Sequence, residues 1–434
     1  MESINCLSPL DGRYLSKTKC LRTYFSEGSL IKYRTHIEMI YLLYLLDFLG
    51  IPNLNFEFFE ITDEDVLEIK KIEKTTKHDV KAVELFLREK IKNKNIHEFI
   101  HFGLTSQDVN SSSYVLSMKE ANKDIIVPRI AAILEIMDNK IVNWLNIPML
   151  SRTHGQPASP TMLGKEILVF RERLNKQLNQ LKKYNYTTKF GGAVGNFNSH
   201  YIAYPDLDWI KFADDFIESM GLKRNRFTTQ IDNYDNYSEI FDILKRISVI
   251  LVDFCRDIWL YISQDYFIQL KVEDEVGSSA MPHKINPIYF ENAEGNLMMA
   301  ISLFEFMSRK LPVSRLQRDL TDSTVLRNLG TCYGHLLIGL ESIISGMKRI
   351  EVNKKEIYRD LQKNKIVLAE AIQTILRKEG IENSYLLIKE MTRGGKDLDI
   401  DELIVLLKEK GIKLHQNIID RIYKLDVKSY TGNF

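Results

Sequence analysis

Residues 237–271 read YSEIFDILKRISVILVDFCRDIWLYISQDYFIQLK, and this stretch decides the fold. It runs for 35 residues with neither glycine nor proline. Apolar residues recur along it at the three- and four-residue spacing of a helix face, from Ile240 through Leu251 to Ile262. A helix of this length spans roughly 50 Å at about 1.5 Å per residue, which exceeds the width of a small domain. The stretch therefore predicts a long helix that needs partner helices along its length.

Shorter periodic stretches on either side supply such partners. Apolar spacing predicts helices over 30–48, over 111–145 with a break or kink near Pro128, and over 161–184, 288–309 and 322–350. The chain holds 10 prolines and 21 glycines, below the usual shares of about 5% and about 7%, which favours long helices over strands and turns. We therefore expect an all-α protein with a central long-helix bundle.

The chain is predicted to divide into three domains. At about 150 residues per domain, 434 residues suggest about three. We expect a mostly helical N-terminal domain over 1–110, the long-helix bundle over 111–352, and a small helical C-terminal domain over 353–434. This last part contains charged helical stretches separated at Gly380, Gly394-Gly395 and Gly411.

Composition excludes several classes of protein. Hydrophobic residues make up 44% and charged residues 27%, the balance of a globular protein rather than a disordered one. The formal net charge of +1 gives no global field to recruit nucleic acid or an anionic membrane. The longest apolar run, 39–46, ends at Asp47 and is too short for a membrane span. The N-terminus has no signal-peptide pattern, and Cys6, Cys20, Cys255 and Cys332 have no paired spacing, so we expect a reducing compartment, the cytoplasm.

Polar stretches punctuated by glycine and proline interrupt the predicted helices. Packing does not explain their composition, and functional residues are often found in such loops. They are SPLDGRY (8–14), TKHDV (76–80), HFGLTSQD (101–108), SRTHGQPASP (151–160), GSSAMPHKINPI (277–288) and SRLQRDLTDSTVLRN (314–328).

Two further patterns imitate known motifs. Residues 97–101 spell HExxH, in which two histidines on one helix face bind zinc. Gly103 would end such a helix almost at once, and no cluster downstream offers an evident third ligand, so we expect this match to be accidental. Gly191, Gly192 and Gly195 miss the spacing of dinucleotide-binding and P-loop motifs, and they indicate a turn.

Two of the polar stretches carry side chains suited to catalysis. His154 stands among small polar residues, glycine and proline, where a histidine can exchange protons near neutral pH. A capping or hydrogen-bonding role for it remains open. In 277–288, Lys284 and Asn286 are donors for an anion beside a Gly-Ser-Ser segment, which suggests a lid over a negative substrate. An ordinary surface loop would explain the glycine and serines but not the donors.

These stretches resemble a known family. GSSAMPHKINPI closely resembles the signature loop of the fumarase/aspartase superfamily, whose members eliminate fumarate from succinyl compounds. THGQPASP, TKHDVKAVE, HFGLTSQD and SPLDGRY together resemble the adenylosuccinate lyase family in its bacterial, purine-biosynthesis form. The resemblance implies a three-domain fumarase/aspartase-like fold. It also implies elimination of fumarate from adenylosuccinate, giving AMP, and from succinylaminoimidazole carboxamide ribotide, giving AICAR.

The resemblance assigns roles to individual residues. It makes His154 the general acid for the departing nitrogen and Ser278 the general base. The positions that would bind substrate are Arg13, Tyr14, Lys77, His78, Asp79, Thr105, Ser106, Gln230, Ser279, Lys284, Ile285, Asn286, Asn292, Arg318, Ser323, Thr324, Val325, Leu326 and Arg327. The chain departs from the family pattern at Lys77, where Asn is usual, at Gln107, where Glu is usual, and at Ala280, where Thr is common.

The residue types suit the implied reaction. Removing a proton next to a carboxylate places extra negative charge on that carboxylate, and Lys284, Asn286, Thr105 and Ser106 are donors for it. A serine is a weak base unless its pKa is lowered, so Ser278 would have to be ionised by the loop's dipoles and Lys284. Such acid–base chemistry needs no metal or redox cofactor.

Assembly and rival functions complete these expectations. The apolar residues of 237–271 cover too wide a face for one thin bundle, and the resemblance implies a homotetramer whose sites are each built from three chains.

Two rival functions are weighed against the lyase. One rival is another superfamily member, such as argininosuccinate lyase or an aspartase-like enzyme, against which TKHDV, THGQ, Arg13 and Arg327 argue. The other is a non-catalytic helical scaffold, against which intact Ser278 and His154 argue.

Overall fold

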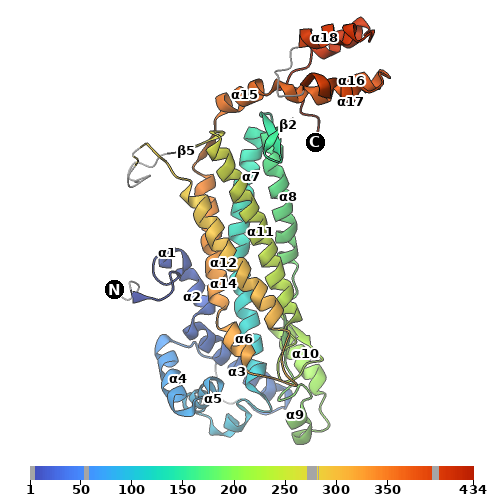
Figure 1. Ribbon diagram of the computed structural model, residues 1–434. Coiled ribbons are helices and arrows are strands. Elements are labelled where there is room, and N and C mark those ends of the chain that lie inside the picture. Colours follow the sequence, from blue (N-terminus) through green and yellow to red (C-terminus); the bar gives the residue numbers. More distant parts are fainter. Residues whose placement is uncertain (1–4, 53–57, 271–280, 282, 393–399) are drawn as a thin grey trace. The chain divides into compact units, whose positions relative to one another are not determined.

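The computed structural model describes residues 5–52, 58–270, 281, 283–392 and 400–434 (Figure 1). Helices dominate these residues, and the strands form three separate two-stranded sheets. The expected all-α class is therefore confirmed. No helix within the described part of the chain is long and apolar enough to cross a membrane.

The chain divides into two compact units. Unit 1 comprises Met1–Ala132, Lys176–Val252 and Asn292–Ser342, and unit 2 comprises Ile133–Asn175, Asp253–Glu291 and Ile343–Phe434. The division into three domains ending at 110, 352 and 434 stays a prediction.

Five helices, here called the long helices, have residues in both units, whereas the other described elements, which include the 22-residue α3, each belong to one unit. The long helices are α7 (Val127–Trp144), α8 (Leu163–Lys182), α11 (Asp235–Ser263), α12 (Ile288–Lys310) and α14 (Leu329–Met347). Unit 1 further contains α1 (Leu15–Thr18), η2 (Lys19–Leu21), α2 (Arg22–Phe25), α3 (Glu27–Phe48), α4 (Asp63–Thr76), α5 (Asp79–Lys90), η3 (Lys94–Phe99), α6 (Ser106–Ala121), η4 (Asn122–Ile126), β3 (Thr187–Lys189), α9 (Asn198–Ala203), α10 (Trp209–Ser219), β4 (Lys223–Asn225) and α13 (Thr321–Leu326). Unit 2 contains β1 (Pro148–Thr153), β2 (Gln156–Met162), β5 (Phe267–Gln269), β6 (Ile350–Val352), α15 (Lys354–Lys363), η5 (Lys365–Leu368), α16 (Ala369–Lys378), α17 (Ser384–Thr392), α18 (Ile400–Glu409) and α19 (Gln416–Tyr423).

Aromatic side chains join the long helices within unit 1. The rings of Phe241 on α11 and Phe304 on α12 stack with centroids 5.8 Å apart, and Phe304 meets Tyr333 on α14 edge-on at 5.9 Å. Gly339 on α14 allows close approach of α12, because a Cβ there would lie 2.6 Å from the side chain of Leu297. These contacts join α11, α12 and α14, three helices of the bundle that the apolar spacing predicted.

Helix α11 is shorter than predicted. It ends at Ser263 rather than at residue 271, because Asp265 adopts a left-handed conformation with φ 59°. The N–H of Asp265 donates to Ile262 O at 3.0 Å and that of Tyr266 to Tyr261 O at 2.9 Å, which is the Schellman pattern of a helix C-terminus. Aspartate can take the place of the usual glycine because its short polar side chain tolerates this conformation.

Two other predicted helices contain interruptions. The kink expected near Pro128 is a π-helical turn, η4, immediately before α7. Proline cannot donate an N–H and clashes with the preceding turn, which is the physical reason for the irregularity. The helix predicted over 322–350 is instead two helices, α13 and α14, separated at Arg327 and Asn328. The side-chain amide of Asn328 donates to Thr324 O at 3.1 Å and competes with the backbone.

The short C-terminal helices have a core of their own within unit 2. Helices α16 to α19 contribute Ile372, Leu376, Ile388, Leu403, Leu407, Ile418 and Ile422 to it. The predicted breaks at Gly380 and Gly411 are confirmed, with φ 73° and 80°. Gly394 and Gly395 lie outside the described residues.

Candidate active site

The turn between α4 and α5 presents the TKHDV residues. Lys77 ends α4 in a left-handed conformation with φ 55°, and His78 begins α5 as its N-cap. The imidazole Nδ1 of His78 accepts a hydrogen bond from the Lys81 backbone N–H at 3.1 Å. Nη2 of the Arg34 guanidinium lies 2.8 Å from Asp79 Oδ2 and forms an ion pair with it. The turn is therefore fixed at both ends, while the side chains of Lys77 and His78 remain exposed.

Asp79 also links this turn to α13. Its carboxylate forms a second ion pair, with the Arg327 guanidinium at 3.1 Å. Arg327 also forms an ion pair with Glu27 at 3.3 Å. Burial alone would raise the pKa of Asp79, but Arg34, the Val80 backbone N–H and Arg327 outweigh it and hold the pKa below its ordinary value of 3.8. Asp79 is therefore a charged anchor near neutral pH, and Arg327 carries positive charge to the surface of unit 1.

The HFGLTSQD residues form the N-terminus of α6. Thr105 is the N-cap residue, and its backbone N–H donates to Asp108 Oδ2 at 2.8 Å. Thr105 and Ser106 are only partly buried. The free N–H groups and dipole of a helix N-terminus favour a negatively charged ligand beside these hydroxyls.

A second polar group of unit 1 surrounds Arg318. Its guanidinium donates to Gln230 Oε1 at 3.1 Å and to the Ser323 hydroxyl at 3.4 Å. The Arg318 Nε is buried and has no hydrogen-bond partner in the described residues. The buried carboxylate of Asp322, the residue before Ser323, accepts from the Tyr234 hydroxyl at 2.8 Å. The structure thus brings Gln230, Arg318 and Ser323 together with an unused donor.

The remaining predicted residues of unit 1 differ in exposure. The Asn292 amide donates to the Tyr14 hydroxyl at 2.9 Å, so these two predicted residues are adjacent. Arg13 and Thr324 are exposed, whereas Val325 and Leu326 are buried in the core. The side chains of Val325 and Leu326 therefore anchor α13 in the hydrophobic core.

His154 occupies the tip of a β-hairpin in unit 2 that the sequence analysis did not predict. Strands β1 and β2 pair antiparallel, with Thr153 opposite Gln156. His154 and Gly155 both have positive φ, 54° and 73°, as a type I′ turn requires. The imidazole is exposed at this tip. Two prolines in β2, Pro157 and Pro160, obscured the strand pattern in the sequence.

The signature loop is described only in its second half. Ser278 and Ser279 lie outside the described residues, so their roles stay predictions. Lys284 is exposed, and its backbone N–H donates to Met281 O at 3.1 Å. The Gln269 side-chain amide donates to Ile285 O at 2.8 Å and ties the loop to the end of β5.

The HExxH residues do not form the helix that this motif requires. The 3-10 helix η3 ends at Phe99, before His101. His97 Nε2 lies 2.7 Å from Ile91 O, and His101 Nδ1 lies 2.5 Å from Oε1 of the buried Glu38 carboxylate. Among the described residues, no cluster of three histidine, cysteine, aspartate or glutamate side chains has the arrangement of a metal site.

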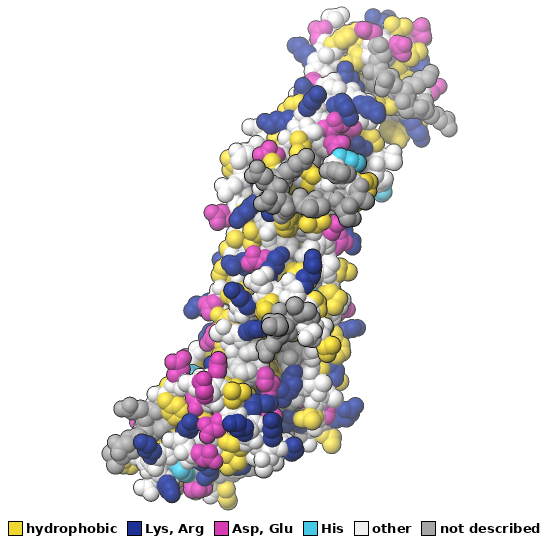
Figure 2. Space-filling model, turned by 90° about the vertical axis from the view of Figure 1, so that its left-hand side faces the viewer, with side chains coloured by type: hydrophobic (Ala, Val, Ile, Leu, Met, Phe, Trp, Pro, Cys, Tyr) yellow, Lys and Arg dark blue, Asp and Glu magenta, His cyan; other side chains and the backbone are white. Residues whose placement is uncertain are grey.

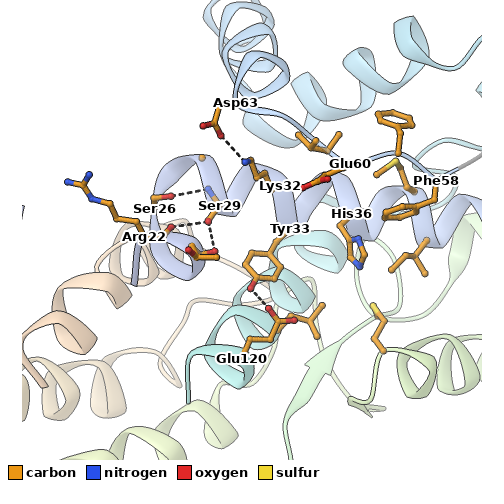
Figure 3. Close-up of a pocket in the computed structure, with 18 of the residues that line it drawn as sticks. Arg22, Ser26, Ser29, Lys32, Tyr33, His36, Phe58, Glu60, Asp63 and Glu120 are labelled. Carbon is orange, nitrogen blue, oxygen red and sulfur yellow. Dashed lines mark hydrogen bonds and ion pairs between the residues drawn. The ribbon is translucent and has the colours of Figure 1, made fainter. Parts of the chain in front are cut away.

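A separate cavity of about 860 Å³ lies beside α3 (Figure 3). Among its polar side chains, Lys32 contacts Asp63 at 2.8 Å, and the Tyr33 hydroxyl donates to Glu120. None of the predicted site residues lines it. On the face shown in Figure 2, positive and negative side chains are interspersed, in keeping with the formal net charge of +1.

Comparisons with known proteins agree with these motifs. The sequence model of a family described as "Lyase" matches residues 55–301, and that of "Adenylosuccinate lyase C-terminal" matches residues 314–431. The chain is 47% identical to an adenylosuccinate lyase of Dictyostelium discoideum, covering 100% of this chain and 97% of the relative. The adenylosuccinate lyases of Vibrio cholerae and Escherichia coli are 45% and 44% identical, each over 100% of this chain and over 98% and 97% of the relative.

Solved structures share the fold at low sequence identity. A 3-carboxy-cis,cis-muconate lactonizing enzyme from Pseudomonas putida aligns with a TM-score of 0.74 at 19% identity, covering 95% of this chain and 94% of that one. A fumarate lyase from a Mesorhizobium species aligns with a TM-score of 0.76 at 16% identity, covering 95% of both chains. These two matches establish the fold and nothing finer.

Proposed function

The chain belongs to the adenylosuccinate lyase family of the fumarase/aspartase superfamily, and from this premise we propose how its residues divide the work of the reaction. It is a lyase that eliminates fumarate from adenylosuccinate and leaves AMP. We extend this to succinylaminoimidazole carboxamide ribotide, giving AICAR, because it carries the same succinylamino group and ribose phosphate. The observation that carries the assignment is 44–47% identity to adenylosuccinate lyases over the whole chain.

His154 is the proposed general acid. The leaving nitrogen must gain a proton as the C–N bond breaks, and an imidazole can supply one near pH 7. The hairpin tip carries His154 away from the body of β1 and β2, and its exposure leaves the ring nitrogens accessible. Such a residue can reach into a site that another part of the assembly completes.

Ser278 is the proposed general base, acting on the carbon next to a substrate carboxylate. The proton leaves as the C–N bond weakens, and negative charge builds up on that carboxylate. Lys284, which is exposed in the described half of the same loop, is the proposed source of positive charge that favours the ionised form of Ser278. Thr105 and Ser106 at the N-terminus of α6 are proposed donors to the carboxylate.

The phosphate of the substrate is the proposed ligand of Arg13, Ser323 and Arg327. Arg327 is 44% exposed and shares its charge with Asp79 and Glu27, so a phosphate can approach it from the solvent side. Arg318 and Gln230, which already contact each other, are further proposed substrate ligands, and the buried Arg318 Nε can donate to the substrate only after neighbouring atoms move. The reaction as proposed uses acid–base groups throughout and requires no metal or redox cofactor.

We further propose a homotetramer in the cytoplasm, with each active site shared between subunits. Apolar side chains remain exposed on the long helices of each unit. Unit 1 exposes Val249, Met298, Met299 and Phe306, and unit 2 exposes Val169, Trp259 and Leu260. Burying such faces against copies of the chain is the usual way to form a closed symmetric oligomer.

An ultraviolet assay of the purified protein tests the function. Adenylosuccinate and the ribotide are supplied separately, while purine or imidazole absorbance and fumarate release are followed. Both substrates are expected to give fumarate in a 1:1 ratio with the nucleotide product, and argininosuccinate is expected to remain intact. Turnover of argininosuccinate in place of adenylosuccinate would support the rival lyase, and failure with all three would support the scaffold.

A further inference from the structure

One buried carboxylate connects two segments of unit 1 that are far apart in sequence. Asp108 accepts the Thr105 backbone N–H through Oδ2, at 2.8 Å. Through Oδ1 it accepts the backbone N–H groups of Gly191 at 2.8 Å and Gly192 at 3.2 Å. Asp108 therefore fastens the N-terminus of α6 to the glycine turn, which we define as Gly191–Gly195.

A buried lysine closes the same connection. The ammonium group of Lys189 lies 2.7 Å from Asp108 Oδ1 and donates to Gly192 O at 2.6 Å. Both charged side chains are 0% exposed. Burial lowers the pKa of Lys189, and the neighbouring Asp108 charge opposes that shift without cancelling it. A charged pair in such a place holds a defined geometry, because neither partner can turn toward water.

The glycine turn packs closely on two backbones. A Cβ on Gly192 would lie 3.0 Å from the carbonyl oxygen of Gly103, two residues before Thr105. A Cβ on Gly195 would lie 2.4 Å from the carbonyl oxygen of Thr228, two residues before Gln230. Both glycines have positive φ, 76° and 85°. The turn thus contacts the backbone just before Thr105 through Gly192 and the backbone just before Gln230 through Gly195.

We propose that the glycine turn, locked by Asp108 and Lys189, is a positioning element that sets the placement of Thr105 and Ser106 relative to Gln230. None of its residues need touch the substrate. This inference rests on the proposed function, because it assumes that those three residues bind the substrate. It gives a role to the FGGAVGN stretch, which the sequence analysis could describe only as a turn.

Gly195→Ala is the variant that tests the spacing. Ordinary contact of a Cβ begins near 3.4 Å, so the added methyl at 2.4 Å has to push the Thr228 carbonyl about 1 Å away. A misplacement of that size costs roughly 100-fold when it affects groups that position a substrate. We expect kcat/KM for adenylosuccinate to fall by about that factor, with a higher KM as well as a lower kcat.

Gly50→Ala is the matched control. Gly50 has a similar positive φ of 65°, but nothing lies within 4 Å of a Cβ built there. It therefore carries the same kind of backbone strain without the contact. We expect Gly50→Ala to retain kcat/KM close to wild type. A comparable loss in both variants would mean that strain alone is responsible, and the proposal would be wrong.

Hydrogen exchange gives a readout that does not depend on turnover. Amides of residues 226–232 are expected to exchange faster in Gly195→Ala than in wild type or Gly50→Ala. If the wild type has no lyase activity, the proposed function fails, while the exchange difference still tests the coupling. Gly195→Ala with full kcat/KM and a native far-UV spectrum would overturn the positioning role.

Gly192→Ala decides the matter if Gly195→Ala does not fold. Its methyl would start 3.0 Å from the Gly103 carbonyl oxygen and needs a displacement of only a few tenths of an ångström. We expect a smaller loss of kcat/KM and faster exchange over residues 103–108. Unchanged kinetics together with unchanged exchange would contradict the proposal.

Discussion

The N-terminus of α6 and the tip of the β1–β2 hairpin carry proposed site residues in opposite ways. In unit 1, Thr105 is held by Asp108, which is itself held by Lys189, and both charges are 0% exposed. In unit 2, His154 is exposed on a two-residue turn. Hydrogen bonds within the chain thus fix Thr105, which is proposed to bind substrate. The proposed general acid, His154, is instead exposed to solvent. This contrast agrees with the proposal that another subunit completes the site around His154.

The largest effect on stability is expected from Lys189→Met. Removing the ammonium group leaves the Asp108 carboxylate buried without a counter-charge, and breaking a buried pair in this way costs about 3–5 kcal/mol. Denaturant unfolding of wild type and variant measures the loss. Lys211→Met is the control, because Lys211 is 70% exposed in its pair with Asp215 and exposed pairs contribute less than about 1 kcal/mol. Equal, small losses in both variants would show that the buried Lys189–Asp108 pair holds the N-terminus of α6 no more firmly than an exposed pair would.

The largest effect on activity without loss of stability is expected from His154→Asn. Asparagine-glycine is the preferred type I′ turn pair, so the hairpin geometry is preserved while the imidazole is lost. We expect kcat to fall at least about 100-fold, the scale of losing a positioned acid, with an unchanged unfolding midpoint. Stopped or continuous ultraviolet assays measure the first and thermal unfolding the second. Near-normal turnover would exclude His154 as the acid.

A smaller effect, and one that depends on pH, is expected from Asp79→Asn. The folded protein holds the pKa of Asp79 below its ordinary value of 3.8, so the charged form stabilises the fold above that value. This contribution is lost as pH falls below about 4 toward the folded pKa. We expect Asp79→Asn to be less stable than wild type by about 1.5–3 kcal/mol at pH 7, the range for hydrogen bonds to charged groups.

The pH dependence supplies the control for Asp79. The stability difference between wild type and Asp79→Asn should narrow as the pH is lowered through the acidic range. Unfolding curves collected from pH 7 down to about 3 test this sign. A difference that stays constant over that range would show that Asp79 contributes through shape rather than charge.

Apolar periodicity predicted most of the helices, and it failed where polar side chains set a boundary. Helix α8 lies within the predicted range, because its apolar residues recur on one face and that face is buried. The end of α11 depends on Asp265 in a left-handed conformation, for which the sequence had no glycine as a signal. The separation of α13 from α14 depends on the Asn328 side chain. Such local competition between side chain and backbone leaves no periodic trace.

The site was predictable where its residues form a motif in the sequence. It was unpredictable where folding brings together residues that are far apart in the sequence. Asp108 stands three residues after Thr105, the spacing of a capping box, so that pattern could have revealed it. Lys189 and Arg34 had no comparable signal, because a lysine or arginine in sequence is far more often exposed than fully buried. Only the structure shows that they hold Asp108 and Asp79.

The central claim, a site shared between subunits, is tested most directly by mixing two inactive variants. His154→Asn and Ser278→Ala proteins are dissociated together, reassembled at a 1:1 ratio and assayed with adenylosuccinate, and a tagged pull-down confirms mixed oligomers. If the two residues come from different subunits, random assortment gives 1/2 × 1/2, so roughly a quarter of wild-type activity returns. Mixed oligomers that form and stay inactive would place both residues in one chain and contradict the claim.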